Sequence, residues 1–364
     1  MTSIVLAAGF WGQNIGNAFI NLGGRWIVEK AFPSARVGFV QDQPGYKTFN
    51  NQRKGNPTNA FDWLANVDAD VLVLQGALLT RGFPNLWRKS FDALRERRVK
   101  VVLLGVSFST YTRVEVHRVR EFLESYPPSV LVARDAPTYE RIRDLVSASY
   151  LGLDSAFALS HAYAPLPMAL SEPYVVLTFD HHPEPRIRGS DDERVSRPEG
   201  WWRRAFAGIG GEFDFAGSRW ELSTPRLQSF LSARGIGQSY VGAALDFRRL
   251  RHQVNGYRIM RCEHRFQPYV KWKAFKRPNS MISDEPFTYC SIYSSSALTI
   301  TDRVHAAVAT LAYGQPTMLM NRSGRSALFA RVGAADVQMR PVKVPREHLD
   351  SELAQEVEFL GNAI

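Results

Sequence analysis

The chain has 364 residues, of which 45% are hydrophobic and 22% charged. This composition excludes a largely disordered chain, and the length is sufficient for two domains of ordinary size. The net charge is +10, which would favour anionic partners, but there is no run of five Lys or Arg residues and no zinc-finger or RRM pattern. We therefore expect no binding of nucleic acid.

The apolar runs, the N-terminus and the cysteines indicate the cellular compartment. No apolar run reaches the roughly 18 residues needed to span a bilayer. The apolar N-terminus lacks the basic region and the cleavage site of a signal peptide. The two cysteines, Cys262 and Cys290, are not part of a Cys-x-x-Cys motif, which argues against a disulfide framework or a zinc site. We expect a cytoplasmic protein.

Apolar strands and helices alternate over the first 160 residues. Strands are predicted at 3–8, 35–40, 70–76, 99–105, 130–135 and 149–154, and helices at 18–32, 86–98, 114–126 and 138–146. Near-continuous apolar strands separated by helices are typical of a parallel sheet covered on both faces. Residues 1–165 are therefore predicted to form a Rossmann-like α/β domain.

A stretch that contains prolines, residues 161–173, marks the predicted domain boundary. Beyond it, strands are predicted at 174–180, 257–262, 297–301 and 316–320, and helices at 238–254, 287–296 and 303–313. Residues 183–220 are irregular and rich in Gly and charged residues, so we interpret them as a long functional insertion outside the packed core. Residues 170–340 should form a second Rossmann-like domain, residues 341–364 a C-terminal helical segment, and the two domains should enclose a cleft.

The segment Thr301-Asp302-Arg303-Val304-His305 joins a predicted strand to a predicted helix. Taken alone, Arg-x-His at the start of a helix is more often structural, because the arginine can pair with an aspartate and the histidine can be a satisfied core residue. Its setting is more informative, since the helix ends in a Gly314-Gln315-Pro316 turn before the next strand.

This whole stretch, 297–333, resembles the C-terminal signature of the polysaccharide pyruvyl transferase family: an apolar strand, Arg-aliphatic-His-Gly, and a helix ending in Gly-x-Pro. Four further elements resemble the family's Asn-x-Gly-Asp, Gly-rich loop, Arg-Asp and Asp-x-x-Phe elements, and they are Asn14-Ile15-Gly16-Asn17, Gly105-Val106-Ser107, Ala133-Arg134-Asp135 and Asp154-Ser155-Ala156-Phe157. Residues 183–285 match no motif that we can name.

The resemblance implies a GT-B-like fold and transfer of the carboxyvinyl group of phosphoenolpyruvate onto two hydroxyls of one sugar, which gives a pyruvate ketal. Arg303 and His305 would be the catalytic residues, the arginine on the phosphate or carboxylate and the histidine on the phosphate as general acid. Val304 would contribute its backbone, and Arg134 would be a second contact to phosphoenolpyruvate. The chemistry of phosphoenolpyruvate is consistent with these roles, because arginine side chains and a helix N-terminus both bind small anions. The reaction requires no metal or cofactor.

Other substrate contacts are implied less directly. They are Asn14 and Asn17 at the cleft mouth, Ser107 in the Gly-rich loop, Asp180 and His181 at a strand end, and Arg322, with Arg325 as the alternative, at a position often held by Lys. A surface turn is the alternative interpretation of Asp180 and His181. Two positions depart from the family pattern: Ala306 replaces a glycine, and Asn17 replaces an aspartate and so removes a charge.

The expected partners are phosphoenolpyruvate and a sugar or lipid-linked saccharide acceptor. The sequence Trp201-Trp202-Arg203-Arg204 suggests a carbohydrate platform or peripheral contact with the inner face of the membrane, against the alternative of a helix that packs its tryptophans inward. Two other functions stay open: a GT-B-type glycosyltransferase that uses a nucleotide sugar, and a non-catalytic or nucleic-acid-binding relative.

Overall fold

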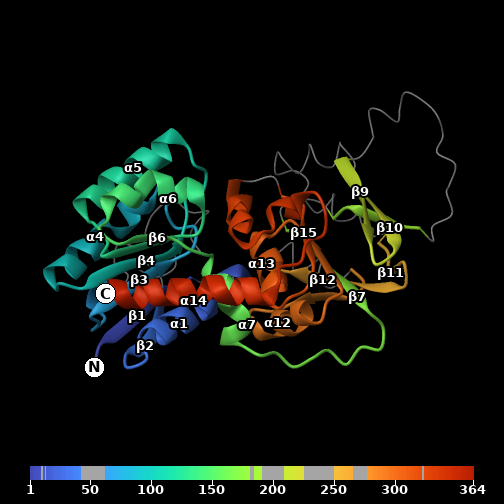
Figure 1. The fold of residues 1–364 in the computed structure, drawn as a ribbon, viewed down its shortest axis with the longest axis horizontal. Coiled ribbons are helices and arrows are strands. Elements are labelled where there is room, and N and C mark those ends of the chain that lie inside the picture. Colours follow the sequence, from blue (N-terminus) through green and yellow to red (C-terminus); the bar gives the residue numbers. More distant parts are fainter. Residues whose placement is uncertain are drawn as a thin grey trace. The chain divides into compact units, whose positions relative to one another are not determined.

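The computed structural model describes residues 1–9, 11–12, 14–41, 62–180, 184–190, 209–224, 250–264, 277–321 and 324–364. The chain forms two compact units (Figure 1). Unit 1 comprises Met1–Ala164, Ser323–Ala335 and Val344–Ile364, and unit 2 comprises Pro165–Arg322 and Asp336–Lys343. The sequence placed 323–335 in the second domain, and this is corrected here, because Phe329 packs on Phe157 of unit 1.

Unit 1 is built on a six-stranded parallel sheet in the order β2-β1-β3-β4-β5-β6. The strands are β1 (Ser3–Ala8), β2 (Arg36–Gln41), β3 (Val71–Gln75), β4 (Lys100–Val106), β5 (Val130–Ala133) and β6 (Ser149–Leu151). The central strands β3, β4 and β5 are almost wholly buried. Burial on both faces explains why they appear in the sequence as continuous apolar runs.

Helices cover both faces of this sheet (Figure 1). One face carries α4 (Phe83–Glu96) and α5 (Arg113–Ser125), preceded by the short α3 (Trp63–Asn66), and α6 (Ala136–Ile142) follows β5. The other carries α1 (Ile15–Ala31) and α14 (Arg346–Ala363), with the short η2 (Ser155–Ala158) and α7 (Leu159–Ala162). Helix α1 needs a glycine where it meets η2, because a Cβ on Gly23 would lie 1.9 Å from the carbonyl oxygen of Ser155.

Unit 2 contains a second six-stranded sheet, with the order β11-β12-β7-β14-β15 and β13 paired to β12. Its strands are β7 (Tyr174–Thr178), β11 (Gln253–Val254), β12 (Tyr257–Glu263), β13 (Ser280–Ile282), β14 (Leu298–Thr301) and β15 (Thr317–Leu319). All pairs are parallel except β11–β12. Helices α12 (Phe287–Ser294) and α13 (Val304–Ala312) pack on one face, where Tyr174 donates to the carbonyl of Ile292 and Thr310 to Thr299.

A small antiparallel sheet packs against the parallel sheet within unit 2, in the region that the sequence assigned to an insertion outside the core. Its strands β8 (Arg186–Gly189), β9 (Ile209–Phe215) and β10 (Ser218–Thr224) lie in the order β8-β10-β9. Trp220 and Phe213 are buried in one cluster with Leu177 and Ile300 of the parallel sheet. The interpretation as an insertion outside the core is therefore wrong for these strands.

Two shorter segments also test the sequence predictions. The helix predicted over 238–254 is wrong at its end, where Gln253 and Val254 pair with β12 as strand β11. The rest of that helix, 238–249, lies outside the described residues. The short segments η4 (Gly324–Val332) and η5 (Ala335–Gln338) precede the C-terminal helix α14.

Both sheets reverse their strand order once. In unit 1 the chain passes from β1 to β2 on one side and then to β3 on the other, so the reversal lies between β1 and β3. In unit 2, strands β11, β12 and β13 lie on one side of β7. Strands β14 and β15 lie on its other side, so the reversal lies between β7 and β14. Two Rossmann-like α/β domains are thus confirmed. Ligands of such sheets bind beyond the carboxyl ends of the strands at the reversal.

No helix in the part of the chain that the structure describes is both long enough and apolar enough to cross a membrane.

Candidate active site

The reversal point of unit 2 carries a buried ion pair. Asp180 follows β7, Arg303 follows β14, and the Arg303 Nε lies 3.3 Å from the Asp180 Oδ2. Their side chains are 8% and 1% exposed, respectively. A charge pair with so little solvent contact is weakly screened, so the guanidinium is held at a fixed place at the end of the sheet.

Asp302 fastens the ends of the same two strands to each other. Its Oδ1 accepts a hydrogen bond of 3.1 Å from the backbone N–H of Asp180, and its own N–H donates to the carbonyl of Thr178. On its other side, the Asn321 amide donates to the carbonyl of Asp302. The side chain of Asp302 thus positions the backbone of Asp180, whose side chain in turn holds Arg303.

Helix α13 begins directly after Arg303, which is its N-cap residue in extended conformation. The first backbone bond of the helix runs from the N–H of Ala307 to the carbonyl of Arg303. The N–H groups of Val304, His305 and Ala306 therefore have no acceptor inside the helix, which is the arrangement that binds anions at helix N-termini. Val304 is buried and His305 is half-buried.

A buried polar cluster lies beneath this edge of the sheet. His264 follows β12, is buried, and has its Nε2 2.5 Å from the hydroxyl of Tyr293, which is 3.1 Å from the Thr178 hydroxyl. Burial raises the pKa of Tyr293 well above its ordinary value. The tyrosine therefore stays a neutral phenol at physiological pH, and it bridges His264 and Thr178 in the interior of unit 2.

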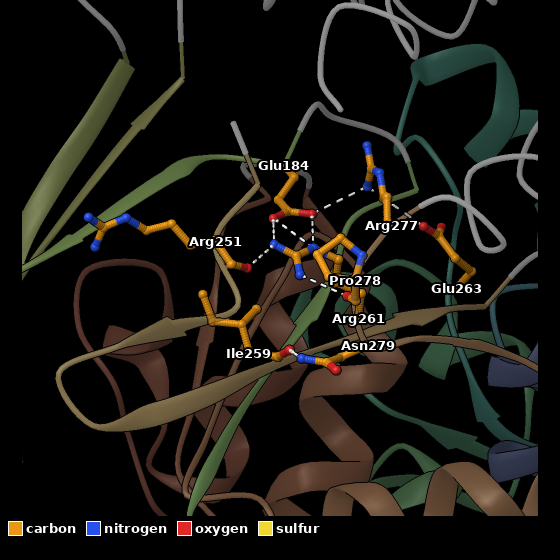
Figure 2. Close-up of polar contacts among 8 residues, drawn as sticks. All are labelled: Glu184, Arg251, Ile259, Arg261, Glu263, Arg277, Pro278 and Asn279. Carbon is orange, nitrogen blue, oxygen red and sulfur yellow. Dashed lines mark hydrogen bonds and ion pairs between the residues drawn. The ribbon is translucent and has the colours of Figure 1, made fainter. Parts of the chain in front are cut away.

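Four charged side chains form a second buried network near the end of β12 (Figure 2). Both Glu184 oxygens accept from Arg261, at 2.8 to 3.0 Å. Arg277 lies between Glu184 and Glu263, at 3.3 and 3.8 Å. Two arginines are thus balanced by two glutamates, and the network ties the segment that follows Asp180 to β12. Its members are spread over residues 184–277, so no local pattern in the sequence indicates it.

Arg134, the second predicted phosphoenolpyruvate contact, lies inside unit 1. Its side chain is 1% exposed and forms a buried ion pair with Asp154. Its Nε also donates to the Ser107 hydroxyl at 2.9 Å. The structure thus brings Arg134 and Ser107 together, in an environment typical of a structural ion pair. With 1% of its side chain exposed, Arg134 presents little surface to a substrate.

The two predicted asparagines of unit 1 also lie together. Asn14 is the N-cap residue of α1, and its amide donates to the Asn17 Oδ1 at 3.2 Å. Both are half-buried at the carboxyl end of β1. Asn17 packs on Gly9, where a Cβ would approach its amide nitrogen to 2.7 Å.

Several predicted site residues lie outside the described residues: His181, Arg322 and the segment 201–204. Arg325, the alternative to Arg322, is described and donates to the Ser109 hydroxyl of unit 1. In unit 2 the structure brings together four of the predicted residues, which are Asp180, Arg303, Val304 and His305. Among the described residues, no group of three or more His, Cys, Asp or Glu is placed to hold a metal ion.

The fold was compared with solved structures. A putative UDP-N-acetylglucosamine 2-epimerase from Listeria monocytogenes is 10% identical, with 99% of this chain and 90% of that chain covered and a TM-score of 0.49. The UDP-GlcNAc 2-epimerase from Neisseria meningitidis bound to UDP-GlcNAc is 10% identical, with coverage of 99% and 94% and a TM-score of 0.46. That from Methanocaldococcus jannaschii is 12% identical, with coverage of 97% and 92% and a TM-score of 0.44.

None of the curated protein sequences compared with the chain matches it. The family model described as polysaccharide pyruvyl transferase matches residues 14–324, which span the paired asparagines of unit 1, the Arg134–Asp154 pair and the whole Arg303 site. A match over most of the chain that includes each of these groups is more than a local motif. The chain belongs to the polysaccharide pyruvyl transferase family.

Proposed function

We propose that the protein transfers the carboxyvinyl group of phosphoenolpyruvate onto a hexose of a cell-surface polysaccharide or its precursor, with formation of a pyruvate ketal. The observation that carries the proposal is the geometry at the start of α13. A buried guanidinium, a half-buried imidazole and a row of helix N-terminal N–H groups occur together at the reversal point of a Rossmann-like sheet. We place this reaction in the cytoplasm.

The chemistry of phosphoenolpyruvate explains why these groups are useful. In the reaction, C3 gains a proton, C2 gains bonds to two sugar oxygens, and the bond between C2 and the phosphate oxygen breaks. The two sugar hydroxyls release two protons, of which C3 takes one and the departing phosphate the other. Arg303 supplies a fixed positive charge for phosphate or carboxylate, and the N–H groups of Val304 and His305 supply donors without a charge of their own.

His305 is assigned the proton transfer. It occupies the second position of the helix, one residue beyond the N–H of Val304. An imidazole there can donate to a phosphate oxygen as the bond to C2 breaks, because histidine changes its charge near neutral pH. Asp180 is assigned to hold Arg303, and the Arg134–Asp154 pair to hold the ends of β5 and β6.

The test is binding and turnover of phosphoenolpyruvate. In thermal unfolding, phosphoenolpyruvate should raise the melting temperature, since a ligand at 100 times its Kd stabilises the folded state by about 2.7 kcal/mol. UDP-sugars should leave the melting temperature unchanged. With a hexose acceptor, phosphate should be released, and Arg303→Ala and His305→Ala should abolish this release.

Matched control variants come from exposed residues. Arg340 and His348 are exposed, and Arg340→Ala and His348→Ala should retain full activity. Stabilisation by UDP-sugars with none by millimolar phosphoenolpyruvate would support the glycosyltransferase alternative instead. Full activity of both Arg303→Ala and His305→Ala would show that the site is elsewhere.

A further inference from the structure

The reversal point of unit 1 also carries a group of functional side chains, and it has a different chemistry. It lies between β1 and β3, where the loop after β1 begins at Gly9 and β3 ends at Gln75. Trp11 in that loop was not among the residues selected from the sequence. In open α/β sheets, ligands bind at such reversal points.

The indole of Trp11 is held from two sides. Its Nε1 donates to the Asn21 Oδ1 at 3.0 Å, and its ring meets Phe39 edge-on with centroids 6.3 Å apart. Asn21 is itself buried, and its amide donates to the Gln75 Oε1 at 3.3 Å. The ring orientation is therefore fixed by α1, β2 and β3 together. Trp11 as a whole residue is only half-buried, so it is not enclosed in the core of unit 1.

The paired asparagines lie in the same loop-to-helix turn. Asn14 follows Trp11 closely enough for its N–H to donate to the Trp11 carbonyl at 3.0 Å, and its amide pairs with that of Asn17. The five side chains of this group, Trp11, Asn14, Asn17, Asn21 and Gln75, carry no charge. This contrasts with unit 2, where the reversal point is built from Asp180, Asp302 and Arg303.

We propose that Trp11, with Asn14 and Asn17, forms a subsite for a pyranose ring of the acceptor saccharide. The apolar C–H face of the sugar stacks on the indole, and its hydroxyls bond to the asparagine amides. This inference deepens the proposed function and rests on it for the identity of the sugar as the acceptor.

The physical argument rests on the chemistry of the two partners. A pyranose presents an apolar face of C–H groups and a rim of hydroxyls, and an indole whose N–H is already bonded presents a face without donors. An amide offers one acceptor and two donors, which matches hydroxyls that both donate and accept. An anion such as phosphoenolpyruvate would instead need arginine or lysine, and this group contains neither.

The test measures hexose binding without the transfer reaction. Saturation-transfer NMR with the full chain and a panel of methyl hexopyranosides should show binding to the wild-type protein. Trp11→Ala and Trp11→Leu should weaken it at least tenfold, and Trp11→Phe, which retains a ring, less than threefold. Phosphoenolpyruvate affinity should change less than twofold in all three variants. The leucine variant preserves apolar packing on Phe39 and guards against simple unfolding of the alanine variant.

The matched control is Trp63→Ala, because Trp63 also belongs to unit 1 and is 52% exposed. It should bind hexosides as the wild-type protein does. Unchanged affinity in Trp11→Leu, or no binding of any hexoside to the wild-type protein, would overturn the subsite. Failure of the proposed function has a different signature: hexosides bind in a Trp11-dependent way, but phosphoenolpyruvate neither binds nor releases phosphate.

Discussion

The buried ion pair between Arg303 and Asp180 orients a side chain more than it stabilises the fold. Removing a guanidinium and a carboxylate from water is costly, and their attraction often does no more than offset that cost. The ion pair instead fixes the orientation of the Arg303 side chain, since a carboxylate beside the Nε restricts the plane of the guanidinium. Asp302 extends this control to the backbone from which Asp180 projects.

If Asp180 acts only through Arg303, its removal should matter only while Arg303 is present. We expect Asp180→Ala to weaken phosphoenolpyruvate binding about tenfold, equivalent to about 1.4 kcal/mol. In the Arg303→Ala background the same change should have no further effect. The four Kd values of this double-mutant cycle, measured by calorimetry, give the coupling directly.

Asp180→Asn refines the same cycle, because it keeps a side-chain oxygen beside the Arg303 Nε and should retain most of the affinity. Asp336→Ala is the control, because Asp336 pairs with Arg340 on the surface of unit 2. Equal losses from Asp180→Ala in both backgrounds would show that the aspartate acts independently of Arg303.

The sequence predicted Arg303 and His305 but not the partner of the arginine. The strand-to-helix context of 297–313 is local and could be recognised from neighbouring residues. The contact to Asp180 depends instead on the register of β7 with β14, which sets Thr178 beside Thr301. That register is a tertiary property, and Asp180 and Arg303 are 123 positions apart in the sequence.

At the scale of elements, the same distinction separates what could be predicted from what could not. The parallel strands were found because burial on both faces makes them apolar throughout. Strands β9 and β10 were missed because they alternate buried aromatic residues with charged ones, as at Phe213, Asp214 and Trp220, Glu221. Glycines and charges in 209–221 therefore resembled a loop, although one face of the hairpin is core.

Helix α14 carries a buried carboxyl into unit 1. Glu356 is wholly buried, and its Oε2 accepts from the N–H of Leu153 at 2.7 Å. A Cβ on Gly152 would approach the same oxygen to 2.5 Å, so the glycine is required for the contact. Burial raises the pKa of Glu356 from 4.5 to about 8, and the nearby Asp154 adds to the rise. The carboxyl is therefore neutral at pH 7 in the folded protein.

This raised pKa predicts how stability depends on pH. Between pH 4.5 and about 8, the folded state holds a proton on Glu356 that the unfolded state has lost. The free energy of unfolding should therefore fall as pH rises through this window, by at most roughly 4–5 kcal/mol, and level off above it. Glu356→Gln should remove this component, as a slope of urea-unfolding free energies between pH 5 and 9 would show.

The slope must be compared with that of a matched variant, because other groups also titrate. Glu358 is exposed on the same helix, and Glu358→Gln should keep the slope of the wild-type protein. Identical slopes for Glu356→Gln and Glu358→Gln would contradict a neutral buried carboxyl.

At the scale of the whole molecule, two sheets of similar plan have reversal points with opposite chemistry. The reversal point of unit 1 has a fixed indole and side-chain amides. The reversal point of unit 2 has a guanidinium, two carboxylates and a helix N-terminus. A reaction between a neutral saccharide and a small anion requires one site of each kind. The predicted cleft between the two domains stays a prediction.

The path of the chain leads to a last prediction, about how the two units are stabilised. The chain returns to unit 1 at its C-terminus, where Leu349, Leu353 and Leu360 of α14 are buried. Burying three leucines contributes about 5–9 kcal/mol, which is comparable to the entire stability of a typical domain.

A stop after residue 344 should therefore unfold unit 1 while unit 2 keeps its structure. Hydrogen exchange would show this as lost protection in peptides from 62–164 and preserved protection in peptides from 277–321. The control is Gln355→Ala, an exposed change on α14, which should leave both sets of peptides protected. Equal loss of protection in both sets of peptides after truncation would instead show that the two units unfold as one.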